Sequence, residues 1–352
     1  MRHKCMLLRV GICATGIESP VECGNNTKES KMTEHIQNAA AIRSRLHEAV
    51  EKVVVLEQQS TLDLMLVALM TGGHILLDDV PGVGKTLLAR TFARSLDLEF
   101  KRVQFTPDLL PSDVTGLNFY NQKNSSFEFR KGPVFTNILL ADEINRATPR
   151  TQSSLLECMQ EATVTVDGVT HTLAVPFLVI ATQNPVEMEG TFPLPEAQLD
   201  RFLMCVSLGY PSAKGERGIV ERFLTDNPFE RVEPVCSAQD IAVLKAARAQ
   251  VKYAEPVLQY ALELVRTTRE LDGIRLGASP RASLYLARSA QALAALRGRS
   301  YVLPDDVQDV LLPVLGHRLL PDVDSALYET SGPELVRRVM ESVAVPIGPH
   351  HQ

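Results

Sequence analysis

Residues 75–90, ILLDDVPGVGKTLLAR, constrain the fold of this chain more than any other stretch. An apolar run predicts a buried strand, a glycine-rich turn follows it, and an amphipathic segment then begins a helix. The turn fits the G-x-x-x-x-G-K-[ST] pattern of phosphate-binding loops except at its first position, where Asp79 stands. Backbone N–H groups at a helix N-terminus attract anions, because the helix dipole favours negative charge there. The stretch therefore predicts a nucleotide-binding α/β domain.

The loop also predicts its ligands, ATP and Mg²⁺. Lys85 is expected to reach the β- and γ-phosphates, and the Thr86 hydroxyl is expected to hold Mg²⁺. Asp79 is compatible with this reading, because aspartate tolerates turns and left-handed conformations and its carboxylate can point away from the phosphates. The residues expected to surround the nucleotide are Pro81, Gly82, Val83, Gly84, Lys85, Thr86 and Leu87.

Two further strand ends carry polar groups suited to phosphate chemistry. NILLADE places Asp142 and Glu143 after an apolar run, where Asp142 can bind Mg²⁺ and Glu143 can polarise the attacking water. FLVIATQN delivers Gln183 and Asn184, and a neutral amide there can orient that water or sense the γ-phosphate. Each motif alone also has a purely structural interpretation: Asp142-Glu143 as an acidic strand end, and Asn184 as a turn residue. The convergence of three strand ends favours an active site.

Strands alternate with helices through the first part of the chain, which predicts a parallel, doubly wound sheet with its ligand at the carboxyl edge. We expect strands in residues 74–79, 100–105, 137–143 and 177–184. Two β-hairpins are expected to interrupt the plan, one near residues 118–130 and one near 163–173 around Asp167-Gly168.

After Tyr210-Pro211 the strand signals largely cease, and we expect an all-helical second domain. From there on, helices are expected near 214–225, 238–249, 256–271, 281–297, 305–312 and 333–343, with a capping box at Ser237 and Asp240. The predicted organisation is a disordered N-terminal extension (1–31), a nucleotide-binding core (32–230), a helical domain (231–346) and a tail (347–352).

Composition excludes several classes of protein. A formal net charge of −6 does not favour a sequence-blind nucleic-acid binder. The six cysteines lack metal-ligand spacing, the histidines lack it too, and no apolar run reaches the ~20 residues of a membrane span. The basic, apolar N-terminus is broken by Arg9 and lacks a small-residue cleavage site, so secretion is not indicated. We expect a cytoplasmic protein.

Five stretches together resemble the MoxR family of AAA+ ATPases: GGHILLDDVPGVGKT, RVQFTPDLLPSDVTG, ILLADEINRATPRTQSSLLECMQE, VIATQNPVEMEGTFPLPEAQLDRF and GASPRA. The similarity runs from about Ile36 to Val345, and the ATQNP…LPEAQLDRF block is far more specific than the phosphate-loop motif. The resemblance implies a P-loop AAA+ core with two inserted β-hairpins and a C-terminal helical lid. It makes Lys85 and Thr86 the Walker A residues, Asp142 and Glu143 Walker B, and Asn184 sensor 1.

The resemblance also assigns two arginines that sequence geometry alone would leave as surface ion pairs. Arg201, in LDRF, stands at the arginine finger that serves a neighbouring subunit, and Arg281, in SPRA, stands at sensor 2. A ring, expected to be a hexamer, follows from a finger that acts on the neighbour. In such rings the two hairpins face the pore or the axial surface. The family usually has a glycine near the adenine pocket where this chain has Glu57.

MoxR proteins are viewed as chaperone-like ATPases that mature or activate other proteins, often with von Willebrand factor A domain partners. The resemblance implies such a partner here, as a separate protein, because this sequence contains no such domain. Two alternatives stay open. A nucleic-acid motor would use the hairpins, although these contain only Lys123, Arg130 and His171 as basic candidates. A nucleotide-gated binding module with little hydrolysis is opposed by the intact Lys85, Asp142, Glu143 and Asn184 set.

Overall fold

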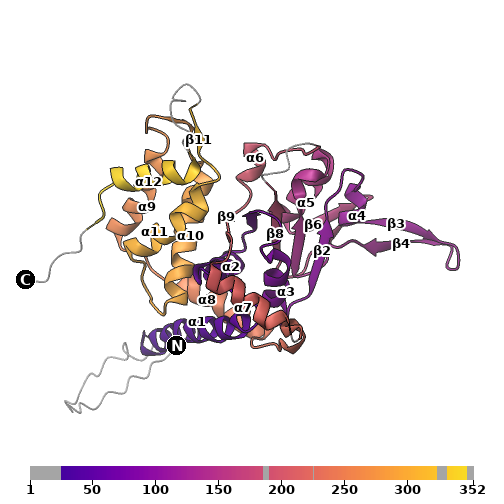
Figure 1. The fold of residues 1–352 in the computed structure, drawn as a ribbon, viewed down its shortest axis with the longest axis horizontal. Coiled ribbons are helices and arrows are strands. Elements are labelled where there is room, and N and C mark those ends of the chain that lie inside the picture. The colour runs from indigo at the N-terminus through magenta and orange to yellow at the C-terminus, as the bar shows by residue number, and fades with distance from the viewer. Residues whose placement is uncertain (1–24, 185–189, 225, 323–330, 347–352) are drawn as a thin grey trace, which may run out of the picture.

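The computed structural model describes residues 25–184, 190–224, 226–322 and 331–346, and it contains a parallel five-stranded sheet at its centre (Figure 1). The strand order is β2-β5-β8-β1-β9. The strands are β1 (Ile75–Asp78), β2 (Phe100–Gln104), β5 (Ile138–Asp142), β8 (Leu178–Gln183) and β9 (Met204–Val206). The four expected strands are confirmed. The edge strand β9 is an addition that the sequence analysis missed.

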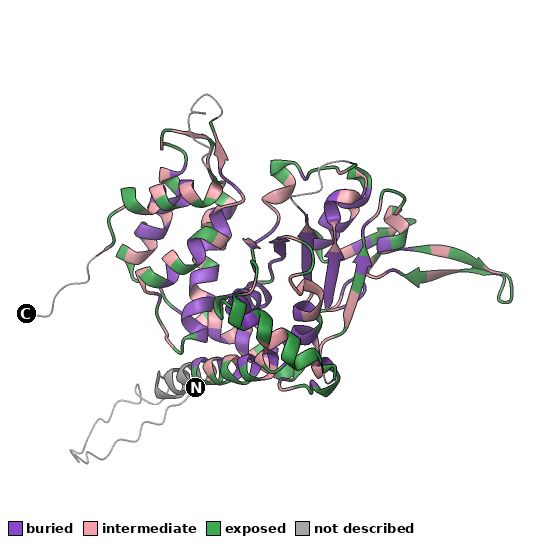
Figure 2. Ribbon diagram, viewed as in Figure 1, coloured by how far each residue is buried: buried purple, intermediate pink, exposed green. Residues whose placement is uncertain are grey.

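Alternate residues of the strands enter two different cores, which explains their continuous apolar runs. Ile75 and Leu77 of β1 pack into the larger cluster with α1, α2 and α3, whereas Leu76 faces the smaller cluster that contains α5. A sheet covered on both faces needs apolar residues at every position of its central strands. Figure 2 shows the resulting buried centre. The central strands β1, β5 and β8 therefore present polar groups only at their carboxyl ends.

The helices of the core lie on both sides of the sheet. They are α1 (Asn25–Glu51), α2 (Ser60–Thr71), α3 (Lys85–Ser95), α4 (Pro111–Thr115), α5 (Pro149–Glu161), α6 (Glu196–Leu199) and α7 (Ala213–Phe223), with the 3-10 turn η1 (Ile144–Arg146). Helix α2 ends at Gly72, which has a left-handed φ of 69°. Helix α1 begins at Asn25, inside the extension expected to be disordered up to residue 31. The rest of that extension and the tail 347–352 lie outside the described residues.

Both β-hairpins are present and they differ in packing. The first, β3 (Gly116–Asn121) with β4 (Ser126–Lys131), extends away from the body in Figure 1, and Phe127 is 74% exposed. The second, β6 (Thr163–Val166) with β7 (Val169–Thr172), buries Val164 against the smaller core. The His171 ring of the second hairpin stacks on Phe129 of the first, with ring centroids 4.1 Å apart.

The second domain is helical except for one small β-ribbon, which corrects the expected all-helical lid. Its helices are α8 (Ala238–Gln250), α9 (Glu255–Thr267), α10 (Pro280–Leu296), α11 (Pro304–Leu315) and α12 (Gly332–Ser342), preceded by the 3-10 turn η2 (Pro228–Arg231). The ribbon pairs β10 (Ile274–Leu276) with β11 (Leu320–Pro321). The capping box of Ser237 and Asp240 is confirmed. Helices α8 and α10 pack on α1 and α2, so one apolar cluster runs from the core into this domain.

No described helix is long and apolar enough to cross a membrane.

Candidate active site

The phosphate loop joins β1 to α3 at the carboxyl edge of the sheet. Gly82 and Gly84 have φ of 86° and 87°, in the left-handed region that L side chains rarely adopt. A Cβ on either glycine would meet nothing within 4 Å, so glycine is required by conformation and the space over the loop is open. The Lys85 Nζ donates to the Asp79 carbonyl at 2.7 Å. Burial lowers the pKa of Lys85, and nearby carboxylates, first that of Asp79, oppose the shift.

Asp79, the departure from the loop pattern, has a definite structural task. Its carboxylate points away from the loop, as the sequence analysis allowed, and is only 5% exposed. It accepts hydrogen bonds from the Ser207 hydroxyl at 3.1 Å, the Gly209 N–H at 3.2 Å and the Leu208 N–H. These donors belong to the segment that leaves β9. Asp79 therefore ties the phosphate loop to that segment.

The acidic pair follows β5, two strands away from β1 in the sheet. Asp142 accepts two hydrogen bonds from Arg102, at 3.0 and 2.7 Å, and one from the Thr182 hydroxyl at 2.6 Å. Glu143 has a left-handed φ of 56°. Its carboxylate is held by Gln104 at 2.7 Å and by Arg146 at 3.2 Å. Side chains from neighbouring elements thus hold both carboxylates at the carboxyl edge of the sheet, where the phosphate loop also lies.

The sequence analysis missed all four supporting residues: Arg102, Gln104, Arg146 and Thr182. Arg102 and Gln104 alternate with the buried Val103 on β2, so both lie on one side of that strand's carboxyl end. Thr182 links the acidic pair, because its hydroxyl donates to Asp142 and accepts from the Glu143 N–H at 2.9 Å. The alternation of polar and apolar residues in RVQ (102–104) was a signal that could have identified Arg102 and Gln104.

One cavity brings most of the expected site residues together. It is lined by Pro81, Gly82, Gly84, Lys85, Thr86, Leu87, Arg102, Asp142, Glu143, Thr182, Gln183 and Asn184. Lys85, the Thr86 hydroxyl, the acidic pair and the open glycine turn form a donor set that fits a Mg²⁺-bound triphosphate. A nucleotide phosphate chain here would meet groups from three strand ends.

A second, largely apolar cavity adjoins the first and shares Gly82, Gly84 and Leu87 with it. Val83 lines this cavity, as do Leu208, Pro211 and Phe223. Glu57 lies at its wall, where its carboxylate accepts from the Ser212 hydroxyl at 2.8 Å and the Ser212 N–H at 2.9 Å. These bonds lower the pKa of Glu57. An apolar space beside a phosphate site suits a nucleoside, and Glu57 ties its wall to α7.

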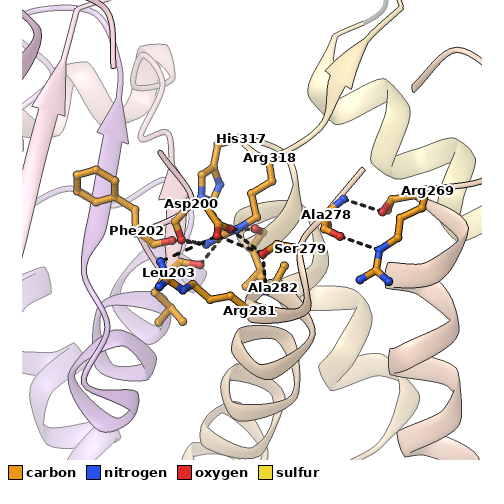
Figure 3. Close-up of polar contacts among 12 residues, drawn as sticks. Asp200, Phe202, Leu203, Arg269, Ala278, Ser279, Arg281, Ala282, His317 and Arg318 are labelled. Atoms are coloured by element: carbon orange, nitrogen blue, oxygen red, sulfur yellow. Dashed lines mark hydrogen bonds and ion pairs between the residues drawn. The ribbon is translucent and has the colours of Figure 1, made fainter. Parts of the chain in front are cut away.

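Arg201 and Arg281 do not line either cavity. Arg201 lies in the turn after α6. Arg281 lies in the first turn of α10, where the core meets the helical domain (Figure 3). The Arg281 guanidinium is 4.0 Å from the Asp200 carboxylate. The structure therefore groups the Walker-type residues with Asn184 and places the two arginines at a separate junction.

Comparison with known proteins matches both parts of the chain to family models. Residues 74–204 match an ATPase family associated with various cellular activities (AAA), and residues 266–339 match an AAA lid domain. A protein of Bacillus subtilis, YeaC, is 47% identical over 86% of this chain and 95% of its own length. Chaperone MoxR1 of Mycobacterium tuberculosis is 43% identical, over 84% of this chain and 80% of its own length. The chain belongs to the MoxR family of AAA+ ATPases.

The MoxR assignment extends to the three-dimensional fold. A solved crystal structure from Cytophaga hutchinsonii superposes with a TM-score of 0.84 at 40% identity, and the match covers 92% of this chain and all of that one. The AAA+ core and lid expected from the sequence are thereby confirmed. Arg201 falls within the matched ATPase region of this MoxR protein, and Arg281 falls within the matched lid.

Proposed function

We propose that this MoxR-family protein binds Mg·ATP in the two joined cavities and hydrolyses it to ADP and phosphate. The observation that carries the proposal is the convergence of Lys85, the acidic pair and Asn184 on one cavity beside an apolar one. The loop N–H groups and Lys85 hold the phosphates, while Thr86 and Asp142 hold Mg²⁺. The metal, when bound, neutralises the charge that develops on the transferring phosphoryl group.

The remaining roles concern the water and the cations. Glu143 takes a proton from the attacking water, and Asn184 orients that water or senses the γ-phosphate. Arg281 responds to nucleotide in its own subunit, whereas Arg201 stabilises the transition state in the neighbouring subunit. An arginine acting on a neighbour requires assembly, so we propose a ring of subunits, a hexamer, working in the cytoplasm.

We further propose that the energy serves to remodel or mature partner proteins. The support is the family membership and a relative of 43% identity named a chaperone. The MoxR resemblance makes a separate protein with a von Willebrand factor A domain the expected partner.

Replacement Glu143→Gln tests the catalytic part. It should lower phosphate release by at least ~100-fold while a fluorescent ATP analogue still binds, because the amide keeps the shape but cannot accept the proton. Glu157→Gln, on the exposed side of α5, is the matched control and should leave turnover unchanged. Equal turnover in Glu143→Gln and the parent protein would refute the assignment of the base.

The same variant tests the partner. Held in ATP, Glu143→Gln should remain assembled and capture its partner, so a pull-down should enrich a protein with a von Willebrand factor A domain. Recovery of DNA alone, or of nothing specific, would count against the remodelling function.

A further inference from the structure

Arg318, a buried arginine of the lid, donates several hydrogen bonds to the turn that contains Arg201. The Arg318 guanidinium donates to the Asp200 carboxylate at 2.8 Å and to the Asp200 carbonyl at 3.2 Å. It also donates to the Leu203 carbonyl at 3.3 Å and to the Phe202 carbonyl. Figure 3 shows Arg318 next to Asp200, Phe202 and Leu203, the residues that lead into β9. Arg318 thus binds the residues on both sides of Arg201.

The surroundings of Arg318 fix its position. Its side chain is only 2% exposed, and its guanidinium lies 5.3 Å from the centre of the Tyr285 ring. The neighbouring His317 Nε2 is 2.7 Å from Arg318 Nη1. Burial, and then the charge of Arg318, holds the pKa of His317 well below its usual value, so the ring is a neutral acceptor. A guanidinium withdrawn from water is stable only with such a full set of partners.

The other side of Asp200 is held by the start of α10. The Ser279 hydroxyl, the N-cap of that helix, lies 3.2 and 3.1 Å from the two carboxylate oxygens of Asp200. Residue Ala278, just before this cap, is fixed to the end of α9 by Thr268 and Arg269, each at 2.9 Å. Asp200 is therefore bound to the lid through two separate elements.

Arg281 makes the weakest of the contacts to Asp200. Its guanidinium is 4.0 Å from the carboxylate and its side chain is 37% exposed. Arg281 can readily leave Asp200 for another anion, because solvent screens this contact and the guanidinium is still largely hydrated. Arg318, which is buried and held by several acceptors, has no such freedom. A change in the environment of Arg281 can therefore displace the start of α10, while Asp200 and Arg318 keep the turn 200–203 attached to the lid.

We propose that Asp200 and Arg318 are positioning residues that couple the lid of each subunit to its Arg201. Nucleotide in a subunit's own cavity moves α10 through Arg281, Asp200 and Arg318 carry that movement to the turn 200–203, and Arg201 is thereby placed toward or away from the neighbour's nucleotide. The inference rests on the proposed function, since it requires hydrolysis with Arg201 acting between subunits.

Subunit mixing tests the proposal. Arg318→Lys keeps the buried charge but loses the planar fork that reaches several carbonyls. Alone it should lower kcat about tenfold with ATP affinity near that of the parent protein, because only the placement of Arg201 is disturbed. Mixed with Glu143→Gln subunits, which retain an intact Arg201 turn, it should regain turnover well above the sum of the two separate variants.

Two reference samples make the result decisive. Arg201→Ala mixed with Glu143→Gln should show the same recovery. Arg337→Lys should behave as the parent protein, since Arg337 pairs with Glu334 and Glu341 on the lid surface. If Arg318→Lys lacks a cooperative melting transition, Asp200→Asn replaces it in the same mixture.

The outcomes separate the two proposals. A normal kcat in Arg318→Lys, or a loss that mixing does not restore while the Arg201→Ala mixture recovers, would overturn the coupling but not the hydrolysis. Absence of turnover in the assembled parent protein would overturn both.

Discussion

Two aspartate–arginine pairs in this protein have the same chemistry, but their arginines have opposite surroundings. In the phosphate cavity, Asp142 pairs with Arg102 at 2.7 Å, and the Arg102 side chain is 48% exposed. At the junction of core and lid, Asp200 pairs with Arg318 at 2.8 Å, and the Arg318 side chain is 2% exposed. The distances are nearly equal. The difference lies in how much water each arginine has lost.

That difference determines what each pair can do. A pair whose arginine remains hydrated contributes ~0–1 kcal/mol, so Arg102 can give up Asp142 to a competing cation at little cost. Removing one partner from a buried pair costs several kcal/mol, because the remaining group is left unpaired away from water. The first arrangement suits a site that must exchange ligands. The second suits a joint that must keep its geometry while the domains move.

The largest expected effect is a contrast in stability between the two arginines. Arg318→Met should lower the free energy of unfolding by about 3 kcal/mol, because Asp200 and four backbone carbonyls lose their buried donor. Arg102→Met should change it by less than about 1 kcal/mol. Urea unfolding of both variants, followed by circular dichroism, measures the contrast. Equal losses would show that burial is not what separates the two pairs.

A third aspartate extends the comparison to a carboxylate held by neutral donors. Asp79→Gly restores the usual phosphate-loop glycine, yet it should reduce stability by about 2 kcal/mol, because the Ser207 hydroxyl and two N–H groups lose their acceptor. The KM for ATP should also rise, since Leu208 and Gly209 line the apolar cavity. Asp79→Asn keeps an acceptor oxygen and should lose less. A gain in stability on restoring the glycine would contradict this account.

His74 supplies the opposite case, a buried base that has no acid partner. It is 5% exposed, its Nδ1 accepts from the Val179 N–H at 3.0 Å, and its Nε2 lies 2.9 Å from the Met159 carbonyl. Burial lowers its pKa from 6.5 to about 4. Between these values the unfolded chain binds a proton that the folded chain does not, so stability falls as the pH decreases through 6.5 toward 4.

The size of this smallest effect is about 2 kcal/mol between pH 7 and pH 5 at most, with the ordinary histidine as the unfolded reference. Thermal melts across that range should show a shallower pH dependence for His74→Gln than for the parent protein. Parallel curves for the two proteins would exclude His74 as the source.

Much of the candidate site was predictable because its residues come in short, contiguous motifs. The phosphate loop, Asp142-Glu143 and Asn184 each follow an apolar strand, and parallel strands bring their carboxyl ends to one edge. The same local logic identified both hairpins and the capping box at Ser237. Strand β9 was missed, since Met204–Val206 is only three residues long and gives little periodic signal.

The partners of those motifs could not be predicted in the same way. Arg102 reaches Asp142 across a sequence separation of 40 residues, and Arg318 reaches Asp200 across 118. Nothing in the sequence around Arg318 distinguishes it from a surface arginine, because burial depends on how α10, α11 and the turn after α6 pack together.

By itself, the sequence determined the family, the parallel sheet with its lid, and most of the residues that line the proposed phosphate cavity. These properties follow from local periodicity and from motifs whose spacing places them on a strand end or a helix start. The tertiary structure alone decided which aspartate is exchangeable and which is fixed, and what Asp79 and Glu57 hold. Such properties depend on desolvation and on contacts between distant segments, and both arise only when the chain has folded.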